Sequence, residues 1–208
     1  MATILVTGFG PFPGALFNPT GPLVERLARL RRPGLADAKI VGHVFPTSYA
    51  AVDRDLPKLI ATHKPDALLM FGLAPRARVV RIETRARNAV ALLPDAGGAA
   101  LSRHAIVPGG PATIALPAPT RTLLAAVYAS HVPAALSSDA GRYLCNYLCW
   151  RAAQATAKPG GLRLAAFVHV PMIRRKVRPR RYTSRLSAAD LARTGIRLVM
   201  VIAAALRC

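Results

Sequence analysis

Hydrophobic positions in the N-terminal part of the chain alternate between two patterns. Short, mostly apolar runs occur at 4–7, 39–45 and 67–71, and the last of these contains no polar residue. Between them, the segments 19–30 and 52–62 carry apolar residues at helical spacing. A wholly apolar run is typical of a strand covered on both faces, and helical spacing predicts an amphipathic helix. The resulting order of strand, helix, strand, helix and strand predicts an α/β fold with a mostly parallel sheet.

The rest of the chain continues this alternation. A helix is predicted at 120–130, an apolar strand at 164–170 and a last helix at 187–208, with Ser187 as its N-cap and Asp190 three residues later. Neither a repeat nor a linker interrupts the pattern, and 208 residues suit one core. We therefore expect a single domain over 1–208, built as a three-layer α/β/α sandwich with a twisted, mostly parallel sheet and helices on both faces.

Cys145 is the candidate nucleophile. A short apolar run at 134–136 leads into a loop of small residues at 137–141, and a helical pattern follows from Leu144. Cys145 is therefore expected at the start of a helix, where backbone N–H groups favour an anion and help a thiol to lose its proton. Such a position suits a cysteine that attacks a carbonyl carbon.

The three cysteines of the chain are Cys145, Cys149 and Cys208. Because their number is odd and no export signal precedes them, we expect free thiols. Cys145 and Cys149 stand one helical turn apart, which a metal could use. His169 is the only further ligand in evidence, so we expect no metal site and no cofactor.

Glu83 and His169 are the candidate partners of the cysteine. Glu83 follows the apolar pair Val79 and Val80 in the arginine-rich segment 72–88, where the surrounding cations favour an ionised carboxylate. Its alternative role is a surface ion pair. His169 lies near the end of the apolar run 164–170, from which its ring would reach the same edge of the sheet as Cys145. The alternative for His169 is a core histidine with satisfied hydrogen bonds.

The segment 8–14, GFGPFPG, is a loop rich in glycine and proline. It follows the first predicted strand, and ligands of open α/β sheets bind at the carboxyl ends of strands. A dinucleotide site is not expected, because no GxGxxG pattern follows. The loop is therefore a candidate ligand-binding segment, and core packing is the structural role expected for its two phenylalanines, Phe9 and Phe12.

Four motifs resemble those of the pyroglutamyl peptidase I family, the pyrrolidone-carboxylate peptidases of peptidase family C15. The densest match is the cysteine signature, and the others are the opening Gly-Phe-x-Pro-Phe with Asn-Pro, the glutamate motif, and a histidine in an apolar strand before Val-Pro. The matching positions are Ser137, Asp139, Ala140, Gly141, Tyr143, Leu144, Cys145 and Asn146; Gly8, Phe9, Pro11, Phe12, Asn18 and Pro19; Gly72, Pro75, Val80, Glu83, Ala86 and Asn88; and His169, Val170 and Pro171.

The resemblance implies a cysteine peptidase that removes an N-terminal pyroglutamyl residue from peptides through an acyl-enzyme. It implies a catalytic triad of Cys145, His169 and Glu83. It also implies a substrate pocket, for which the candidates are Phe9, Phe12, Asn18, Leu73, Tyr143 and Leu144. Members of the family often form tetramers, so a homo-oligomer is a further expectation.

The chain also departs from the family pattern near the glutamate. Leu73 replaces an expected glutamine, and Arg81 replaces a residue with a hydroxyl group. Thr84 and Arg85 stand where a basic residue and then an aliphatic one are usual. A homologue with an altered substrate or weak activity is therefore an alternative.

The formal charge of +20 adds a second alternative, a basic nucleic-acid-binding protein on the same fold. The run 174–185, which begins at Arg174 and ends at Arg185, is the strongest basic segment. It has one tyrosine and no repeated aromatic residues for base stacking, so a solvated loop is the default and nucleic acid the less favoured partner. We find no signal peptide and no apolar run long enough to cross a bilayer, so we expect no membrane partner and a cytoplasmic location.

Overall fold

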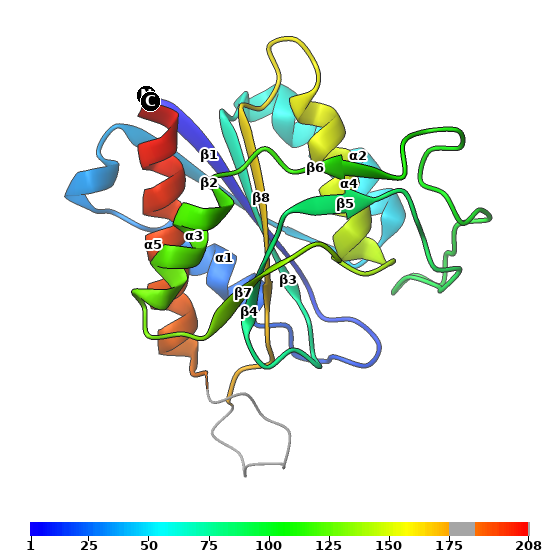
Figure 1. Cartoon of the computed structure of the whole chain (residues 1–208), viewed down its shortest axis with the longest axis horizontal. Helices are drawn as coiled ribbons and strands as arrows, with labels where there is room; N and C mark the ends of the chain where they lie inside the picture. The colour runs from blue at the N-terminus through cyan, green and yellow to red at the C-terminus, as the bar shows by residue number, and fades with distance from the viewer. Residues whose placement is uncertain (175–185, 208) are drawn as a thin grey trace.

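The computed structural model describes residues 1–174 and 186–207 (Figure 1). A six-stranded sheet in the order β2-β1-β3-β8-β4-β7 forms its middle layer. The strands of this sheet are β1 (Ala2–Phe9), β2 (Ala38–Phe45), β3 (Ala67–Leu73), β4 (Val80–Glu83), β7 (Ala134–Ser137) and β8 (Leu164–Val170). A separate pair of strands, β5 (Arg85–Arg87) and β6 (Thr113–Ala115), forms a second, antiparallel sheet.

Helices cover both faces of the large sheet. On one face lie α1 (Thr20–Ala28), α3 (Thr120–Tyr128) and α5 (Ala188–Arg207), and on the other lie α2 (Tyr49–His63) and α4 (Leu144–Thr156). Figure 1 shows the sheet between these two groups of helices. A short 3-10 helix, Pro33–Leu35, follows α1. The predicted three-layer α/β/α sandwich is confirmed.

The sheet changes direction at β4. Strands β2, β1, β3 and β8 run parallel, whereas β4 pairs with β8 in antiparallel fashion and β7 runs parallel to β4. As a result, β4 begins beside the carboxyl end of β8. Arg81 is the register partner of His169, and Glu83 that of Phe167. This reversal places an arginine and a glutamate of β4 beside the end of β8.

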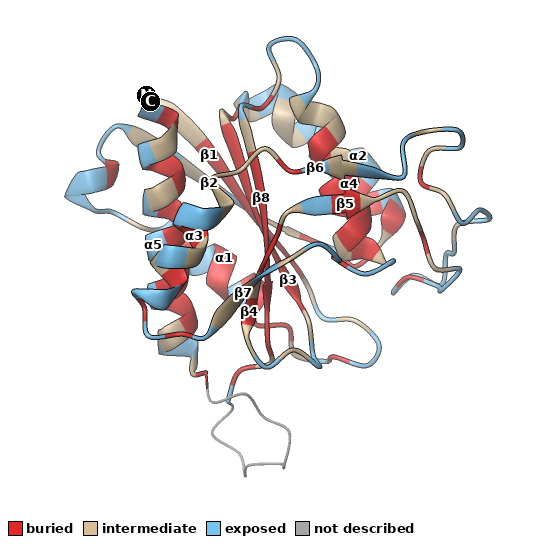
Figure 2. Cartoon of the chain, in the orientation of Figure 1, coloured by how far each residue is buried: buried red, intermediate tan, exposed pale blue. Residues whose placement is uncertain are grey.

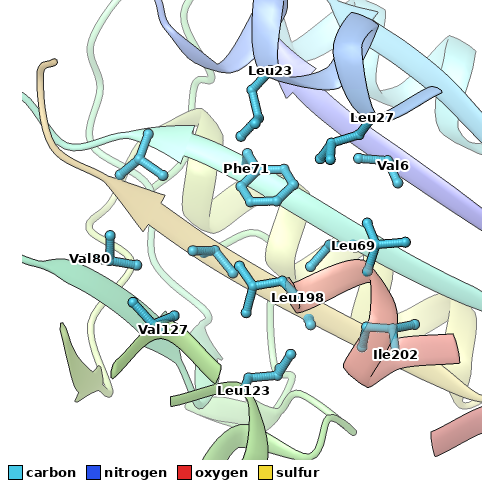
Figure 3. Close-up of a cluster of buried hydrophobic side chains, with 14 of the residues drawn as sticks. Val6, Leu23, Leu27, Leu69, Phe71, Val80, Leu123, Val127, Leu198 and Ile202 are labelled. Carbon is cyan, nitrogen blue, oxygen red and sulfur yellow. The ribbon is translucent and has the colours of Figure 1, made fainter. Parts of the chain in front are cut away.

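Two buried apolar clusters hold the layers together (Figure 2). All seven residues of β3 are buried, as expected for a strand with helices on both sides. Figure 3 shows the cluster beneath α1, α3 and α5, in which Phe71 lies near Leu23 of α1 and Leu198 of α5 faces the same sheet. Burial of these side chains anchors the strands whose ends carry the candidate site.

The last helix begins where the sequence predicts. The Ser187 hydroxyl accepts a hydrogen bond from the Asp190 N–H at 3.1 Å, and the Asp190 carboxylate accepts one from the Ser187 N–H at 2.9 Å. This reciprocal pair is a capping box, so the predicted N-cap is confirmed. The other end of the predicted helix, at Cys208, lies outside the described residues.

The other predicted helices and strands are present, with boundaries that move by a few residues. The sequence did not predict β4, β5 and β6 as strands, because arginines interrupt the apolar pattern of β4 and β5 and because β6 has only three residues. The basic run 174–185 lies outside the described residues except for Arg174. Within 1–174 and 186–207, no helix is long and apolar enough to cross a membrane.

Candidate active site

Glu83 and His169 form a buried pair. His169 is the penultimate residue of β8, and Glu83 ends β4 on the neighbouring strand. The His169 Nδ1 lies 2.7 Å from Glu83 Oε1, and the exposed fractions of the two residues are 3% and 0%. A surface ion pair for Glu83, the alternative from its sequence context, is wrong because its carboxylate lies beneath the protein surface.

Cys145 lies beside the same ring and shares a hydrogen bond with His169. It is the second residue of α4 and is half-buried. A Cβ atom built on Gly72 would lie 2.7 Å from the Cys145 sulfur, so the sulfur rests directly against the backbone of β3. Because Gly72 is the register partner of His169, the sulfur lies beside the strand that carries the imidazole. The three residues that the sequence singled out are therefore brought together.

The electrostatic environment favours a charged His169. Burial by itself lowers the pKa of this ring, but the charge of Cys145 and a hydrogen bond with it, together with the Glu83 carboxylate, raise the pKa to about 9. An imidazolium between a sulfur and a carboxylate is stabilised by opposite charges on both sides. This arrangement can hold a proton at neutral pH beside a nucleophilic sulfur.

Asn146 fastens the start of α4 to the chain beyond Glu83. Its side-chain amide donates to the carbonyl oxygens of Arg87 at 2.8 Å and Ala89 at 2.9 Å, and its oxygen accepts from the Arg87 N–H at 2.8 Å. Asn146 itself is fully buried, and the three hydrogen bonds satisfy both polar atoms of its side-chain amide. The sequence placed Asn146 in the cysteine signature without a role; the structure shows that it positions the turn carrying Cys145.

The candidate pocket residues lie in different environments. Phe9 is buried and packs against Phe45, with ring centroids 5.9 Å apart, while Phe12 is half-buried in the loop after β1. Leu73 ends β3 and is 7% exposed, and Leu144 is 1% exposed in the cluster beneath α2 and α4. Phe9 and Leu144 thus belong to the core, and a contact of their side chains with substrate stays a prediction.

Asn18 holds the loop after β1 in shape. Its amide nitrogen donates to the Gly10 carbonyl oxygen at 3.0 Å, and its oxygen accepts from the Thr20 N–H at 3.1 Å. The Thr20 hydroxyl donates to the same Asn18 oxygen at 2.8 Å. Asn18 therefore positions the loop that carries Phe12, and its predicted contact with substrate stays a prediction.

Tyr143 belongs to an aromatic group that the sequence did not reveal. Its hydroxyl donates to the Pro94 carbonyl oxygen at 2.9 Å, and its ring stands edge-on to Tyr49, with centroids 5.8 Å apart. The ring of Tyr147, one turn along α4, also meets Tyr49 edge-on at 5.1 Å. These contacts join the start of α4 to α2 and to the loop around Pro94.

Asp95 ties that loop to α2. Its carboxylate accepts hydrogen bonds from the N–H groups of Tyr49 at 3.0 Å, Gly97 at 2.9 Å and Ala99 at 3.0 Å. Burial opposes ionisation of Asp95, but these hydrogen bonds lower the pKa of its carboxyl group. No local pattern in the sequence predicts this contact, because Tyr49 is distant from Asp95 along the chain.

Metal ligands do not gather in the part of the chain that the structure describes. No three histidine, cysteine or acidic side chains there are placed to hold an ion. Cys149 is fully buried, and burial raises the pKa of its thiol. Cys149 is therefore a core residue, and Cys145 is the cysteine that borders the Glu83–His169 pair.

Comparison with known proteins agrees with the motifs. A sequence model of the pyroglutamyl peptidase family matches residues 2–204. The chain is 34% identical over 171 residues to the pyrrolidone-carboxylate peptidase of Pyrococcus furiosus, covering 82% of this chain and 81% of that protein. It is 33% identical over 174 residues to pyrrolidone-carboxylate peptidase 1 of Ralstonia nicotianae, covering 83% of this chain and 80% of that protein.

A solved structure resembles the whole fold. A mutant pyrrolidone carboxyl peptidase from Pyrococcus furiosus matches with a TM-score of 0.88 and 29% identity, over 98% of this chain and 99% of that chain. Since the family model covers nearly the whole sequence and the relatives match most of their own length, the chain belongs to the pyroglutamyl peptidase family.

Proposed function

We propose that this protein, acting as a single domain over 1–208, is a cysteine peptidase that removes an N-terminal pyroglutamyl residue from peptides. The observation that carries the proposal is the convergence of Glu83, His169 and the Cys145 sulfur at the ends of β3 and β8. A nucleophile, a base and a group that orients the base are the parts that acyl transfer needs. Membership of the pyroglutamyl peptidase family supports the choice of substrate.

In the proposed mechanism, Glu83 holds the His169 ring through Nδ1, which leaves Nε2 for Cys145. Transfer of the Cys145 thiol proton to His169 gives the thiolate–imidazolium pair that the site favours, and the thiolate attacks the carbonyl carbon of the pyroglutamyl residue. When the tetrahedral intermediate collapses, the C–N bond breaks and His169 gives its proton to the leaving amine. Water then attacks the thioester, with neutral His169 as base, which releases pyroglutamate and restores the thiol.

Backbone N–H groups of the first turn of α4 are suited to stabilise the developing oxyanion. The N-cap residue Tyr143 makes no side-chain capping hydrogen bond to this turn. In hydrolases, one such donor is worth about 2.7 to 4 kcal/mol in the transition state. The pyroglutamyl ring has no free amine, so it suits a pocket with apolar walls, for which Phe12 and Tyr143 are the candidates.

The raised pKa of His169 predicts an alkaline limit to activity. Below a pH of about 9 the ring keeps the proton that the leaving amine needs, and above it that proton is lost. We therefore expect kcat/KM for a pyroglutamyl amide to fall about tenfold per pH unit above this value. A steady-state pH profile tests this expectation. A decline that begins near 6.5, the ordinary value for histidine, would contradict it.

Substitution of Gly72 by alanine should displace the nucleophile. The added Cβ would lie 2.7 Å from the Cys145 sulfur and 2.6 Å from Cζ of Phe167, so at least one of them must move. Because a shift of about 1 Å can cost about 100-fold in rate, we expect kcat to fall by at least that factor. Gly21→Ala is the matched control, since its Cβ would meet Val44 at 3.7 Å, an ordinary contact. Equal kcat values for the two variants would argue against a sulfur seated on Gly72.

Hydrolysis of fluorogenic amides tests the proposed function. The wild-type protein should release aminocoumarin from pyroglutamyl-aminocoumarin and leave alanyl-aminocoumarin and prolyl-aminocoumarin intact, because only the first carries the lactam. Failure to cleave the pyroglutamyl amide, or equal cleavage of all three, would overturn the proposal.

Leu73 favours a second candidate, a peptidase of the same mechanism with a different N-terminal specificity. It directly follows Gly72, and its side chain cannot form a hydrogen bond with a substrate. A panel of N-acetyl, N-formyl and pyroglutamyl peptides separates the two candidates. Faster cleavage of an acetyl or formyl peptide than of the pyroglutamyl peptide would favour the second.

A further inference from the structure

Three neighbouring strands place Gly72, His169 and Arg81 in one row. Gly72 of β3 pairs with His169 of β8, and His169 pairs with Arg81 of β4. Register partners point to the same face of a sheet, which here is the face covered by α4. With strands about 4.8 Å apart, the backbone of Arg81 stands about 10 Å across the sheet from that of Gly72, against which the Cys145 sulfur rests.

The order of the strands gives a substrate its direction. The loop with Phe12, a candidate wall for the pyroglutamyl ring, follows β1, on the side of β3 away from β8. In the proposed mechanism the leaving amine must lie within hydrogen-bonding distance of His169, on β8. With the acyl part against the predicted Phe12 wall, on the β1 side of the sulfur, the leaving peptide would cross β8 towards β4 and Arg81.

A hollow with two arginines lies at that end of the row. It has a volume of about 360 Å³ and is lined by Ala74, Pro75, Arg76, Ala77 and Arg81. Arg76 is exposed, and the Arg81 side chain keeps 35% of its surface exposed. The walls between the two cations are small or apolar, which leaves room for a ligand group between them.

The Glu83 carboxylate, which lies near Arg81, already contacts His169. Arg81 Nε lies 3.7 Å from Glu83 Oε1, the oxygen that also meets the His169 ring at 2.7 Å. Among the ion pairs of residues 1–174 and 186–207, this is the only one that includes an arginine of the hollow. Arg81 Nε is buried and has no hydrogen-bond partner among the described residues. The hollow therefore carries positive charge in excess.

We propose that this hollow binds a carboxylate of the leaving group and makes the enzyme selective for it. The inference rests on the proposed function and extends it to the residue after pyroglutamate. The carboxylate can be the side chain of an acidic residue at that position or the free C-terminus of a pyroglutamyl dipeptide. Guanidinium groups bind carboxylates through paired, charge-assisted hydrogen bonds, which are about twice as strong as neutral ones.

Four substrates that differ only in the leaving group test the proposal. They are pyroglutamyl-alanine amide, pyroglutamyl-glutamate α-amide, pyroglutamyl-lysine amide and pyroglutamyl-alanine with a free carboxylate. At low salt we expect kcat/KM for at least one of the two carboxylate substrates to exceed that of the alanine amide by about tenfold, and the lysine amide to be the poorest. The glutamate and free-acid substrates distinguish the two sources of the carboxylate.

Arginine variants connect the preference to the hollow. In Arg76→Gln and Arg81→Gln, the ratio of kcat/KM between the better carboxylate substrate and the alanine amide should fall towards one. The ratio is the readout because Arg81 is also close to Glu83, so its loss can alter the absolute rate. The matched control is Arg121→Gln, which removes an exposed arginine from α3 on the opposite face.

The outcomes separate this inference from the function on which it rests. Cleavage of all four substrates at similar rates, or a preference that both arginine variants retain, overturns the carboxylate site and leaves the peptidase intact. Cleavage of none of them overturns both. If Arg121→Gln lowers the preference as much as the other two variants do, the preference is due to the overall charge of the protein. That result also overturns the site.

Discussion

Replacement of Cys145 by alanine is expected to lower kcat for pyroglutamyl-aminocoumarin by at least about 10³-fold, which should place it at the limit of detection. The physical reason is that no covalent thioester can form without the sulfur, and neither His169 nor Glu83 can take over its role. The binding of substrate should change less than its turnover, because the pocket walls remain. Stopped assays at high enzyme concentration provide the measurement.

The neighbouring cysteine supplies the control. Cys149 lies one helical turn along α4 and is fully buried. Cys149→Ala removes a thiol from the same helix, but from the side that faces the core. We therefore expect the kcat of this variant to stay within a few-fold of the wild-type value. Thermal unfolding of both variants separates loss of chemistry from loss of fold. Survival of activity in Cys145→Ala would rule out this nucleophile.

Glu83→Gln should produce the second largest loss, a decrease in kcat of about 10² to 10⁴-fold. The substitution keeps the size of the side chain but removes the charge that orients the His169 ring through the 2.7 Å contact. The Glu83 carboxylate also contributes to the raised pKa of His169, so the alkaline limb of the pH profile should move to lower pH in the variant. Both effects are measured in one series of rates against pH.

Glu25 offers a matched control for Glu83. It is an exposed glutamate on α1, and Glu25→Gln removes the same charge from the other face of the sheet. We expect wild-type rates and an unchanged pH profile for Glu25→Gln. If Glu83→Gln also kept the wild-type rate and pH profile, the carboxylate would have no part in catalysis.

The sequence predicted the layers of the fold because most elements carry a clear hydrophobic pattern. The apolar run 67–71 became the buried strand β3, and Ser187 with Asp190 became the cap of α5. β4 was missed as a strand because it has only four residues, two of them the charged Arg81 and Glu83, inside an arginine-rich segment. Its antiparallel direction depends on pairing with β8, a contact that no local pattern encodes.

The three candidate catalytic residues could be predicted because each lies in a recognisable motif. Their supporting residues could not be predicted in the same way. Asn146 bonds to Arg87 and Ala89, and Asp95 bonds to Tyr49, across long distances in sequence. Hydrogen-bond geometry of this kind arises only when the chain is folded, which is why the sequence suggested Cys145 but not what positions it.

A substrate-shaped alkylating reagent tests the central claim most directly. Pyroglutamyl chloromethyl ketone carries its reactive carbon beside the position of the scissile carbonyl. After reaction, peptide mapping by mass spectrometry should show one adduct, on Cys145, in proportion to the loss of activity, and excess pyroglutamate should slow its formation. Loss of activity with the adduct on Cys149, on Cys208 or on no cysteine would contradict a sulfur at Cys145 that attacks the pyroglutamyl carbonyl with the help of His169 and Glu83.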